Sequence, residues 1–190
     1  MFAGYCLHMN HEEESALVIP VPQTEPVVKR WRETLDPGCI LGLPAHITVL
    51  SPFAAPMEIN DEMIATLEGY FSQFDPLDFT FETLGWFGHK VVYLDPTPSD
   101  VFRRITQGVV RSFPMHLPFE GLHGEPTPHL TIGQGAPLEL LQKAAMSVAP
   151  FLPLAASADR VWLMAGGTEP GSWTLRHEFS FGSLETPTRL

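Results

Sequence analysis

The chain is poor in cysteine and in positive charge. Its two cysteines, Cys6 and Cys39, are too few for a disulfide framework and lack a metal-ligand spacing, so we expect a reducing, cytoplasmic compartment. Only 11 lysines and arginines oppose 22 aspartates and glutamates, which gives a net charge of −11. A protein that grips a long nucleic acid duplex needs a basic footprint to displace counterions. Duplex binding is therefore disfavoured, whereas a small phosphorylated substrate or the end of an RNA remains compatible.

Long apolar runs and glycine-rich phosphate loops are missing as well. No run of about 18 uninterrupted apolar residues occurs, so we expect no membrane span, and residues 1–10 lack the basic start of a signal peptide. Without a P-loop or dinucleotide-type glycine loop, neither ATP nor NAD is expected. His8 and His11 precede three glutamates but have no second ligand cluster, so we interpret them as part of a disordered tail. We therefore expect no metal and no cofactor.

What the chain does contain is a short pattern that occurs twice. His46-Ile47-Thr48-Val49 recurs as His129-Leu130-Thr131-Ile132. Each copy is typical of a strand, whose alternation places His and Thr on one face, about 7 Å apart. A single such histidine is often only a packing residue, but two matched copies are improbable by chance. If the two strands lie side by side, two imidazoles and two hydroxyls converge on one site.

Hydrophobic periodicity and turn residues predict an alternation of strands and helices within one domain. The predicted strands are residues 16–22, 45–53, 77–87, 90–94, 129–135, 160–164 and 172–181. The predicted helices are residues 24–35, 58–74, 99–111 and 138–148, and the proline-rich residues 114–128 are a predicted loop. Each half of the chain carries one motif strand, then a helix, then two strands. This order predicts two similar lobes, each offering one histidine to a central cleft.

These residues resemble the 2H phosphoesterase superfamily, which is named for two His-x-Thr/Ser-x motifs with apolar x. Residues 91–96 (VVYLDP) before a predicted helix, and residues 128–132 (PHLTI), look like the bacterial 2′-5′ RNA ligase branch. The resemblance implies an α+β fold with two pseudo-symmetric lobes, each with an antiparallel sheet and helices, and an active cleft between them. We expect residues 1–14 to form a flexible N-terminal tail and residues 15–185 a single bilobal domain.

The resemblance also implies metal-independent chemistry on 2′,3′-cyclic phosphates or 2′-5′ linkages. Ring opening needs a base for the attacking water and an acid for the departing oxygen, and histidine, with an unperturbed pKa of about 6.5, suits both tasks. We expect His129 as base and His46 as acid in hydrolysis, although the sequence does not fix this direction. Thr48 and Thr131 match the family's phosphate-holding positions.

A nucleoside needs a flat surface for stacking, and four aromatic residues lie on or just after strands near the proposed cleft. Tyr93, Phe53 and Trp86 are the candidate substrate-binding residues, with Phe87 beside them, although aromatics in strands are more often core residues. His177 falls on an apolar face, where we expect a hydrogen-bonded core histidine.

We therefore expect a cytoplasmic, cofactor-free phosphodiesterase that acts on a small cyclic nucleotide or an RNA terminus. We expect it to be a monomer that binds neither a long duplex nor a membrane. Two alternatives stay open: a non-catalytic nucleotide- or RNA-end-binding module, and a hydrolase of a non-RNA cyclic phosphate.

Overall fold

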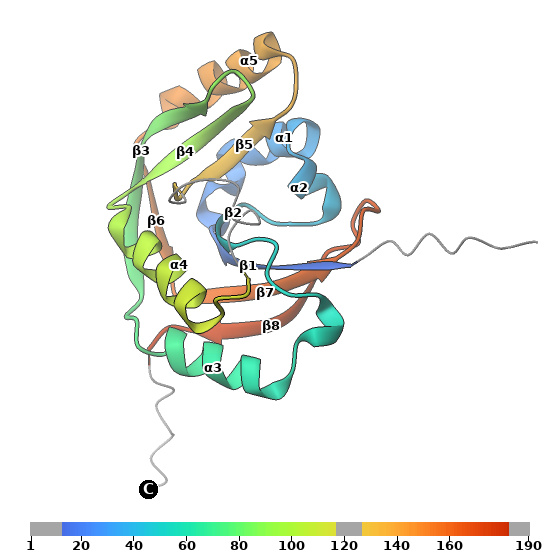
Figure 1. Ribbon diagram of the computed structural model, residues 1–190. Coiled ribbons are helices and arrows are strands. Elements are labelled where there is room, and N and C mark those ends of the chain that lie inside the picture. Colours follow the sequence, from blue (N-terminus) through green and yellow to red (C-terminus); the bar gives the residue numbers. More distant parts are fainter. Residues whose placement is uncertain (1–12, 117–126, 183–190) are drawn as a thin grey trace, which may run out of the picture.

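Two antiparallel four-stranded sheets make up the framework of the chain (Figure 1). The computed structural model describes residues 13–116 and 127–182. Most of the predicted tail, with His8 and His11, lies outside the described residues, as does most of the predicted loop 114–128. The same holds for residues 183–185 at the predicted end of the domain.

The strands are β1 (Glu14–Pro20), β2 (His46–Leu50), β3 (Leu77–Phe87), β4 (Val91–Thr97), β5 (Leu130–Gln134), β6 (Leu154–Ala158), β7 (Arg160–Gly166) and β8 (Thr174–Ser180). The helices are α1 (Glu25–Leu35), α2 (Pro37–Leu41), α3 (Asp61–Phe71), α4 (Asp100–Ser112) and α5 (Leu138–Val148). Short 3-10 turns occupy Pro22–Thr24, Pro56–Glu58 and Ala149–Phe151. The predicted α+β fold with an antiparallel sheet in each lobe is confirmed.

The path of the chain interlaces the two sheets. The first sheet has the order β2-β1-β7-β8 and the second has the order β5-β4-β3-β6. The hairpin β3–β4, which follows the first motif strand, therefore pairs with the second motif strand β5. The hairpin β7–β8, which follows the second motif strand, joins β1 and β2. The two lobes thus do not coincide with the two halves of the chain.

Three local features refine the predicted elements. Strand β6 was not predicted, because its Leu-Ala-Ala-Ser-Ala sequence lacks the β-branched and aromatic residues that favour strands. Its pairing with the first half of β3 supplies the stabilisation instead. The predicted β3–β4 hairpin is confirmed, with Gly88 at φ +57° in its turn. Glu14, the last residue of the predicted tail, already begins β1.

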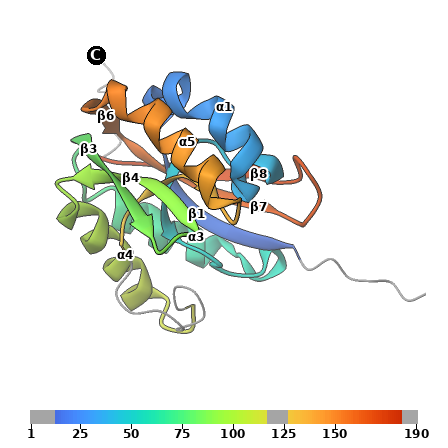
Figure 2. The same ribbon diagram turned by 90° about the horizontal axis from the view of Figure 1, so that it is seen from above.

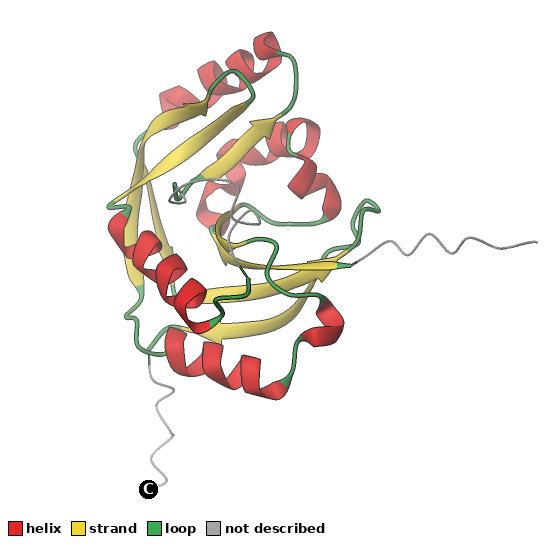
Figure 3. Cartoon of the chain, in the orientation of Figure 1, coloured by secondary structure: helices red, strands yellow, loops and turns green. Residues whose placement is uncertain are grey.

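Each motif strand is covered by a helix that follows a strand of the other sheet. Helix α1 follows β1 but packs against β5, and α4 follows β4 but packs against β2. Helix α5 lies beside α1 (Figure 2), and α3 and α5 lie on opposite sides of the molecule (Figure 3). The two lobes share their interior, because one main hydrophobic core contains residues of both sheets. A smaller cluster of Ala16, Val18, Met164 and Trp173 lies on the other face of the first sheet. Within the described part of the chain, no helix has the length and apolar character needed to cross a membrane.

One glycine in each of α3 and α4 tests the packing between these two helices. A Cβ at Gly108 would overlap the phenol of Tyr70, whose hydroxyl donates to the carbonyl of Arg104 at 2.9 Å. We expect Gly108→Ala to lower the free energy of unfolding by about 1–3 kcal/mol, because the ring must move out of a packed position. Urea denaturation measures this change.

The matched control is Gly69→Ala on α3, where an added Cβ meets nothing within 4 Å. This substitution should leave stability unchanged or raise it by up to about 1 kcal/mol through helix propensity. Equal effects of the two substitutions would contradict the described α3–α4 contact.

Candidate active site

The two motif strands lie against each other as the edge strands of their sheets. Strands β2 and β5 are in contact but belong to different sheets, so no ladder of backbone hydrogen bonds joins them. The predicted alternation of faces is confirmed, since His46, Thr48, His129 and Thr131 are half-buried on the face opposite the core. The apolar members of both motifs are at most 3% exposed in the main core: Ile47, Val49, Leu130 and Ile132.

Both imidazoles are held in the same way. The Nδ1 atom of His46 lies 2.7 Å from the carbonyl oxygen of Pro44, and Nδ1 of His129 lies 2.7 Å from that of Thr127. A carbonyl only accepts, so Nδ1 carries the proton and Nε2 of each neutral ring is left as the acceptor. Each motif thus fixes its own tautomer through the residue two positions earlier. The arrangement leaves two Nε2 atoms available as bases or, after protonation, as acids.

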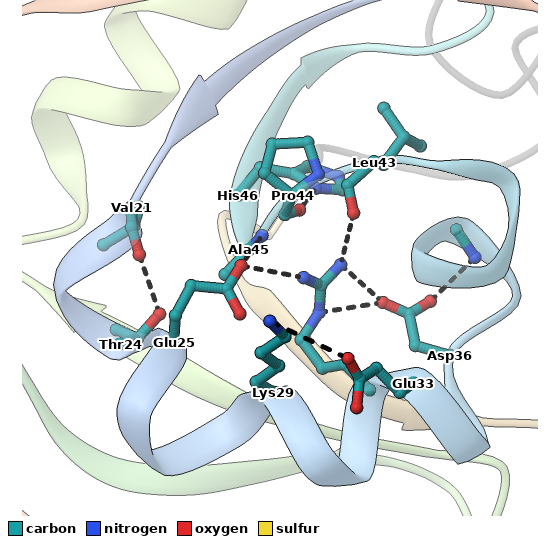
Figure 4. Close-up of polar contacts among 12 residues, drawn as sticks. Val21, Thr24, Glu25, Lys29, Glu33, Asp36, Leu43, Pro44, Ala45 and His46 are labelled. Carbon is teal, nitrogen blue, oxygen red and sulfur yellow. Dashed lines mark hydrogen bonds and ion pairs between the residues drawn. The ribbon is translucent and has the colours of Figure 1, made fainter. Parts of the chain in front are cut away.

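A buried arginine lies behind the motif strands. The Arg32 side chain, 1% exposed, donates from Nε and Nη2 to Oδ2 of Asp36 at 3.0 and 2.8 Å. Nε also donates to the backbone carbonyl of Thr131 at 3.2 Å, and Nη2 to that of Leu43 at 3.4 Å. The carboxylate of Glu25 lies 3.7 Å from Nη1. Figure 4 shows Glu25, Asp36 and Leu43 around this guanidinium, close to His46.

Aromatic rings flank the second motif. The ring centroids of Phe87 and Tyr93 are 4.9 and 5.1 Å from that of His129, and 4.4 Å from each other. Tyr93 lies across Gly85, where a Cβ would overlap its ring, and it pairs across the strands with Thr131. Phe87 is 39% exposed and Tyr93 only 8%, so Phe87 is the member of this pair that solvent reaches.

With the geometry described, the comparison with known sequences identifies the family. A sequence model of the 2′-5′ RNA ligase superfamily matches residues 20–169. The chain belongs to this superfamily, within the 2H phosphoesterases. No curated protein sequence matches the chain.

Several solved structures share the fold of this chain at low sequence identity. Escherichia coli LigT complexed with 3′-AMP is 16% identical, with a TM-score of 0.60 over 90% of this chain and 99% of LigT. LigT complexed with ATP is 18% identical with a TM-score of 0.54 over the same shares of each chain. TT0787 of Thermus thermophilus is 16% identical, with a TM-score of 0.57 over 88% of this chain and 97% of that protein.

In this 2H phosphoesterase, two of the predicted substrate-binding residues lie away from the histidine pair. Phe53 is 2% exposed and packs against Phe113 and His116, with ring centroids 5.3 and 5.4 Å away. Trp86 packs against the main core and pairs with the buried Val92. The structure therefore places both aromatics in or against the core, and Tyr93 is the predicted aromatic that it brings to the site.

A bulge explains the position of Trp86. The pairing of β3 with β4 shifts register between Phe81 and Thr83, so the core-facing residues change from odd to even numbers. After the shift Leu84 and Trp86 face the core, and Phe87 lies on the opposite face with Tyr93 and His129. A one-residue slip moves every later side chain to the other face, and the sequence gives no direct signal of it.

The remaining candidates fall outside the site or do not form one. His177 is half-buried against Phe179, with Nε2 3.1 Å from Oε1 of Glu68. Within residues 13–116 and 127–182, no group of three or more histidine, cysteine, aspartate or glutamate side chains is arranged to hold a metal ion.

Arg32 was missed by the sequence analysis, although the sequence pattern around it indicates burial. It shares the buried stripe of α1 with Val28 and Leu35, where a charged side chain needs a buried partner.

Burial makes both catalytic candidates weak bases in the free protein. Desolvation lowers the pKa of His46 to about 4, with further lowering by Arg32 and His129 and opposition from the Pro44 carbonyl and Asp36. Desolvation also lowers the pKa of His129, against the Thr127 carbonyl, Asp36 and Asp95. Both imidazoles are therefore mainly neutral at pH 7 in the free protein.

This burial predicts a pH-dependent contribution to stability. His46 has a pKa of about 6.5 when unfolded and about 4 when folded, so folding favours its neutral form. The contribution of the neutral His46 ring to the free energy of unfolding is complete above pH 6.5 and is lost as the pH falls toward 4. We expect the stability advantage of wild type over His46→Gln to shrink by about 1–3 kcal/mol between pH 7 and pH 4. Urea denaturation of both proteins measures it, and an unchanged difference would contradict the described environment of His46.

Proposed function

We propose that the chain is a metal-independent phosphodiesterase acting on 2′,3′-cyclic phosphates or 2′-5′ linkages of nucleotides or RNA termini. The observation that carries this proposal is the matched pair of His-Thr strands, each with a fixed Nδ1–H and an available Nε2. Membership in the 2′-5′ RNA ligase superfamily supports the same chemistry. LigT has been crystallised with 3′-AMP, ATP, NADP+ and phosphate, which supports a nucleotide as the ligand of this fold.

The reaction uses one imidazole as base and the other as acid. One Nε2 takes a proton from water as its oxygen forms a bond to phosphorus, and the other Nε2–H protonates the ribose oxygen whose bond to phosphorus breaks. Each proton transfer contributes about 10²–10⁴-fold to the rate. The hydroxyls of Thr48 and Thr131 donate hydrogen bonds to the non-bridging phosphate oxygens, where charge rearranges in the transition state.

The environments of the two histidines favour His46 as the base, the reverse of the direction expected from the sequence. The pKa of His46 falls to about 4, with Arg32 among the causes, so this ring presents a neutral Nε2 even in mildly acidic solution. His129 has Asp95 and Asp36 nearby, and both carboxylates favour its protonated form. The product of ring opening reports which ribose oxygen leaves, because the acid protonates that oxygen.

Substitution of the histidines tests the mechanism. We expect His46→Ala and His129→Ala each to lower kcat at least about 100-fold on nucleoside 2′,3′-cyclic phosphates, because each removes one proton transfer. Product formation is measured by chromatography in the presence of EDTA, with His89→Ala as the matched control. His89 is exposed in the β3–β4 turn, and its removal should leave kcat unchanged.

The outcomes separate the alternatives. Turnover that survives EDTA and is lost in both variants supports the two-histidine reaction. Near-normal turnover in His46→Ala contradicts it. A folded wild-type protein that binds nucleotides without forming product favours the binding module, and turnover restricted to another cyclic phosphate favours the non-RNA hydrolase.

The aromatic pair predicts how a nucleoside is held. Stacking of a base on an aromatic side chain contributes about 1–3 kcal/mol, so Phe87→Leu should raise KM for adenosine 2′,3′-cyclic phosphate about 5- to 100-fold. KM for ribose 2′,3′-cyclic phosphate, which has no base, should stay the same. Phe151→Leu, at an exposed phenylalanine after α5, is the control. Equal changes for both substrates would argue against stacking on Phe87.

A further inference from the structure

We propose that Arg32 is a positioning residue that ties the two motif strands together and sets the relation between His46 and His129. This inference rests on the proposed two-histidine reaction and assigns a role to a side chain outside the motifs. Arg32 is 1% exposed in α1 and donates to the carbonyl of Thr131 in one sheet and to that of Leu43 before the other motif strand. One guanidinium therefore contacts the backbone of both motif segments.

The Thr131 contact places a buried donor on a backbone carbonyl of an edge strand. Strand β5 is an edge strand, and the facing edge strand β2 forms no ladder with it. A buried edge carbonyl without a partner is costly, so a buried donor at this position stabilises the approach of the two strands. Thr131 is the threonine of the second motif, and its backbone is held by Arg32 while its hydroxyl remains on the cleft face.

On the first motif the same helix holds the residues on both sides of Pro44. Leu43 accepts from Arg32, and the backbone N–H of Ala45 donates to Oε1 of Glu25 at 2.8 Å. Pro44 lies between them, and its carbonyl accepts the Nδ1–H of His46. Helix α1 thus fixes the segment whose carbonyl sets the tautomer and direction of the His46 ring.

The charge of the buried arginine is balanced within the same network. Asp36, 5% exposed, accepts two hydrogen bonds from Arg32 and a third from the backbone N–H of Gly38 at 3.0 Å. The planar guanidinium matches these divergent acceptors, whereas a lysine ammonium is a point charge that does not reproduce the fork. Lysine at position 32 therefore keeps the charge but not the bridge.

The charge also acts on the acid–base pair. The charged and titratable groups facing His46 are Arg32, Asp36 and His129, and those facing His129 are Asp36 and Asp95. Arg32 lowers the pKa of His46 and so favours its neutral form. Loss of the guanidinium leaves Asp36 as an unbalanced buried carboxylate near both rings, which raises the pKa of His46.

Three substitutions separate the bridge from the charge. A small displacement of reacting groups costs about 100-fold in rate, so Arg32→Lys should lower kcat about 10- to 100-fold with KM changed less than about threefold. Its acid limb in the pH profile should stay in place. Arg32→Met should lower kcat at least as much and move the acid limb to higher pH, because the pKa of the base rises. Lys29→Met is the control, since it removes a 65% exposed cation from the same helix.

Two further measurements test the inference if Arg32→Met is unstable or if the substrate is not found. The double variant Arg32→Met/Asp36→Asn removes both buried charges while an amide oxygen can still accept from Gly38, and it should show the same loss of kcat. NMR titration of the imidazole protons without substrate should show a raised pKa of His46 in Arg32→Met and no change in Lys29→Met.

Each result has a defined consequence. If wild type turns over cyclic phosphates and Arg32→Lys keeps kcat within about threefold, the positioning role is overturned while the proposed function stands. If wild type turns over nothing in the panel, the proposed function fails and the NMR titration decides the role of Arg32. An unchanged titration of His46 in Arg32→Met overturns that role.

Discussion

The site depends on bringing two sheet edges together without pairing them. A direct ladder between β2 and β5 would satisfy the edge backbone, but it would merge the two sheets and fix the motif strands in one pleated surface. The chain instead keeps two sheets with one shared core beneath them. Arg32, balanced by Asp36, donates to the Thr131 carbonyl of β5 and to the Leu43 carbonyl just before β2. A single buried side chain thereby links the two motif segments, which no strand pairing joins.

The burial that holds the motif strands also sets the protonation of the histidines. Both rings are mainly neutral in the free protein, which suits the base but not the acid of the proposed reaction. A phosphate anion bound between the rings stabilises an imidazolium, because an opposite charge at close range favours the protonated form. In the proposed reaction, substrate binding therefore creates the acid. The carboxylates of Asp36 and Asp95 favour His129 as the ring that takes this proton.

The parts of the structure that sequence reasoning predicted are those governed by local periodicity. Strand alternation alone placed His46 and Thr48 on one face and Ile47 in the core, and glycine at the β3–β4 turn marked the hairpin. The partners of each strand are non-local, so the interlaced sheets were not predicted from the order of elements. Trp86 was misplaced because the bulge after Phe81 reverses the faces of β3. The only signal of Arg32 in the sequence is its position as a charged residue within an apolar helical stripe. Its partners could not be predicted, because they come from distant segments.

The interlaced path of the chain holds the two motif strands together, because neither lobe can move away from the other as an independent domain could. Helix α1 follows a strand of the first sheet and covers β5, whereas α4 follows a strand of the second sheet and covers β2. Separation of the lobes would therefore expose both helix–strand contacts and the shared core at once, a loss far larger than the single Arg32 bridge. The core sets the approach of the strands to within a packing distance. The bridge then holds the Thr131 and Leu43 backbones to one helix and, through the Pro44 segment, the direction of the His46 ring, on which the proposed proton transfer depends.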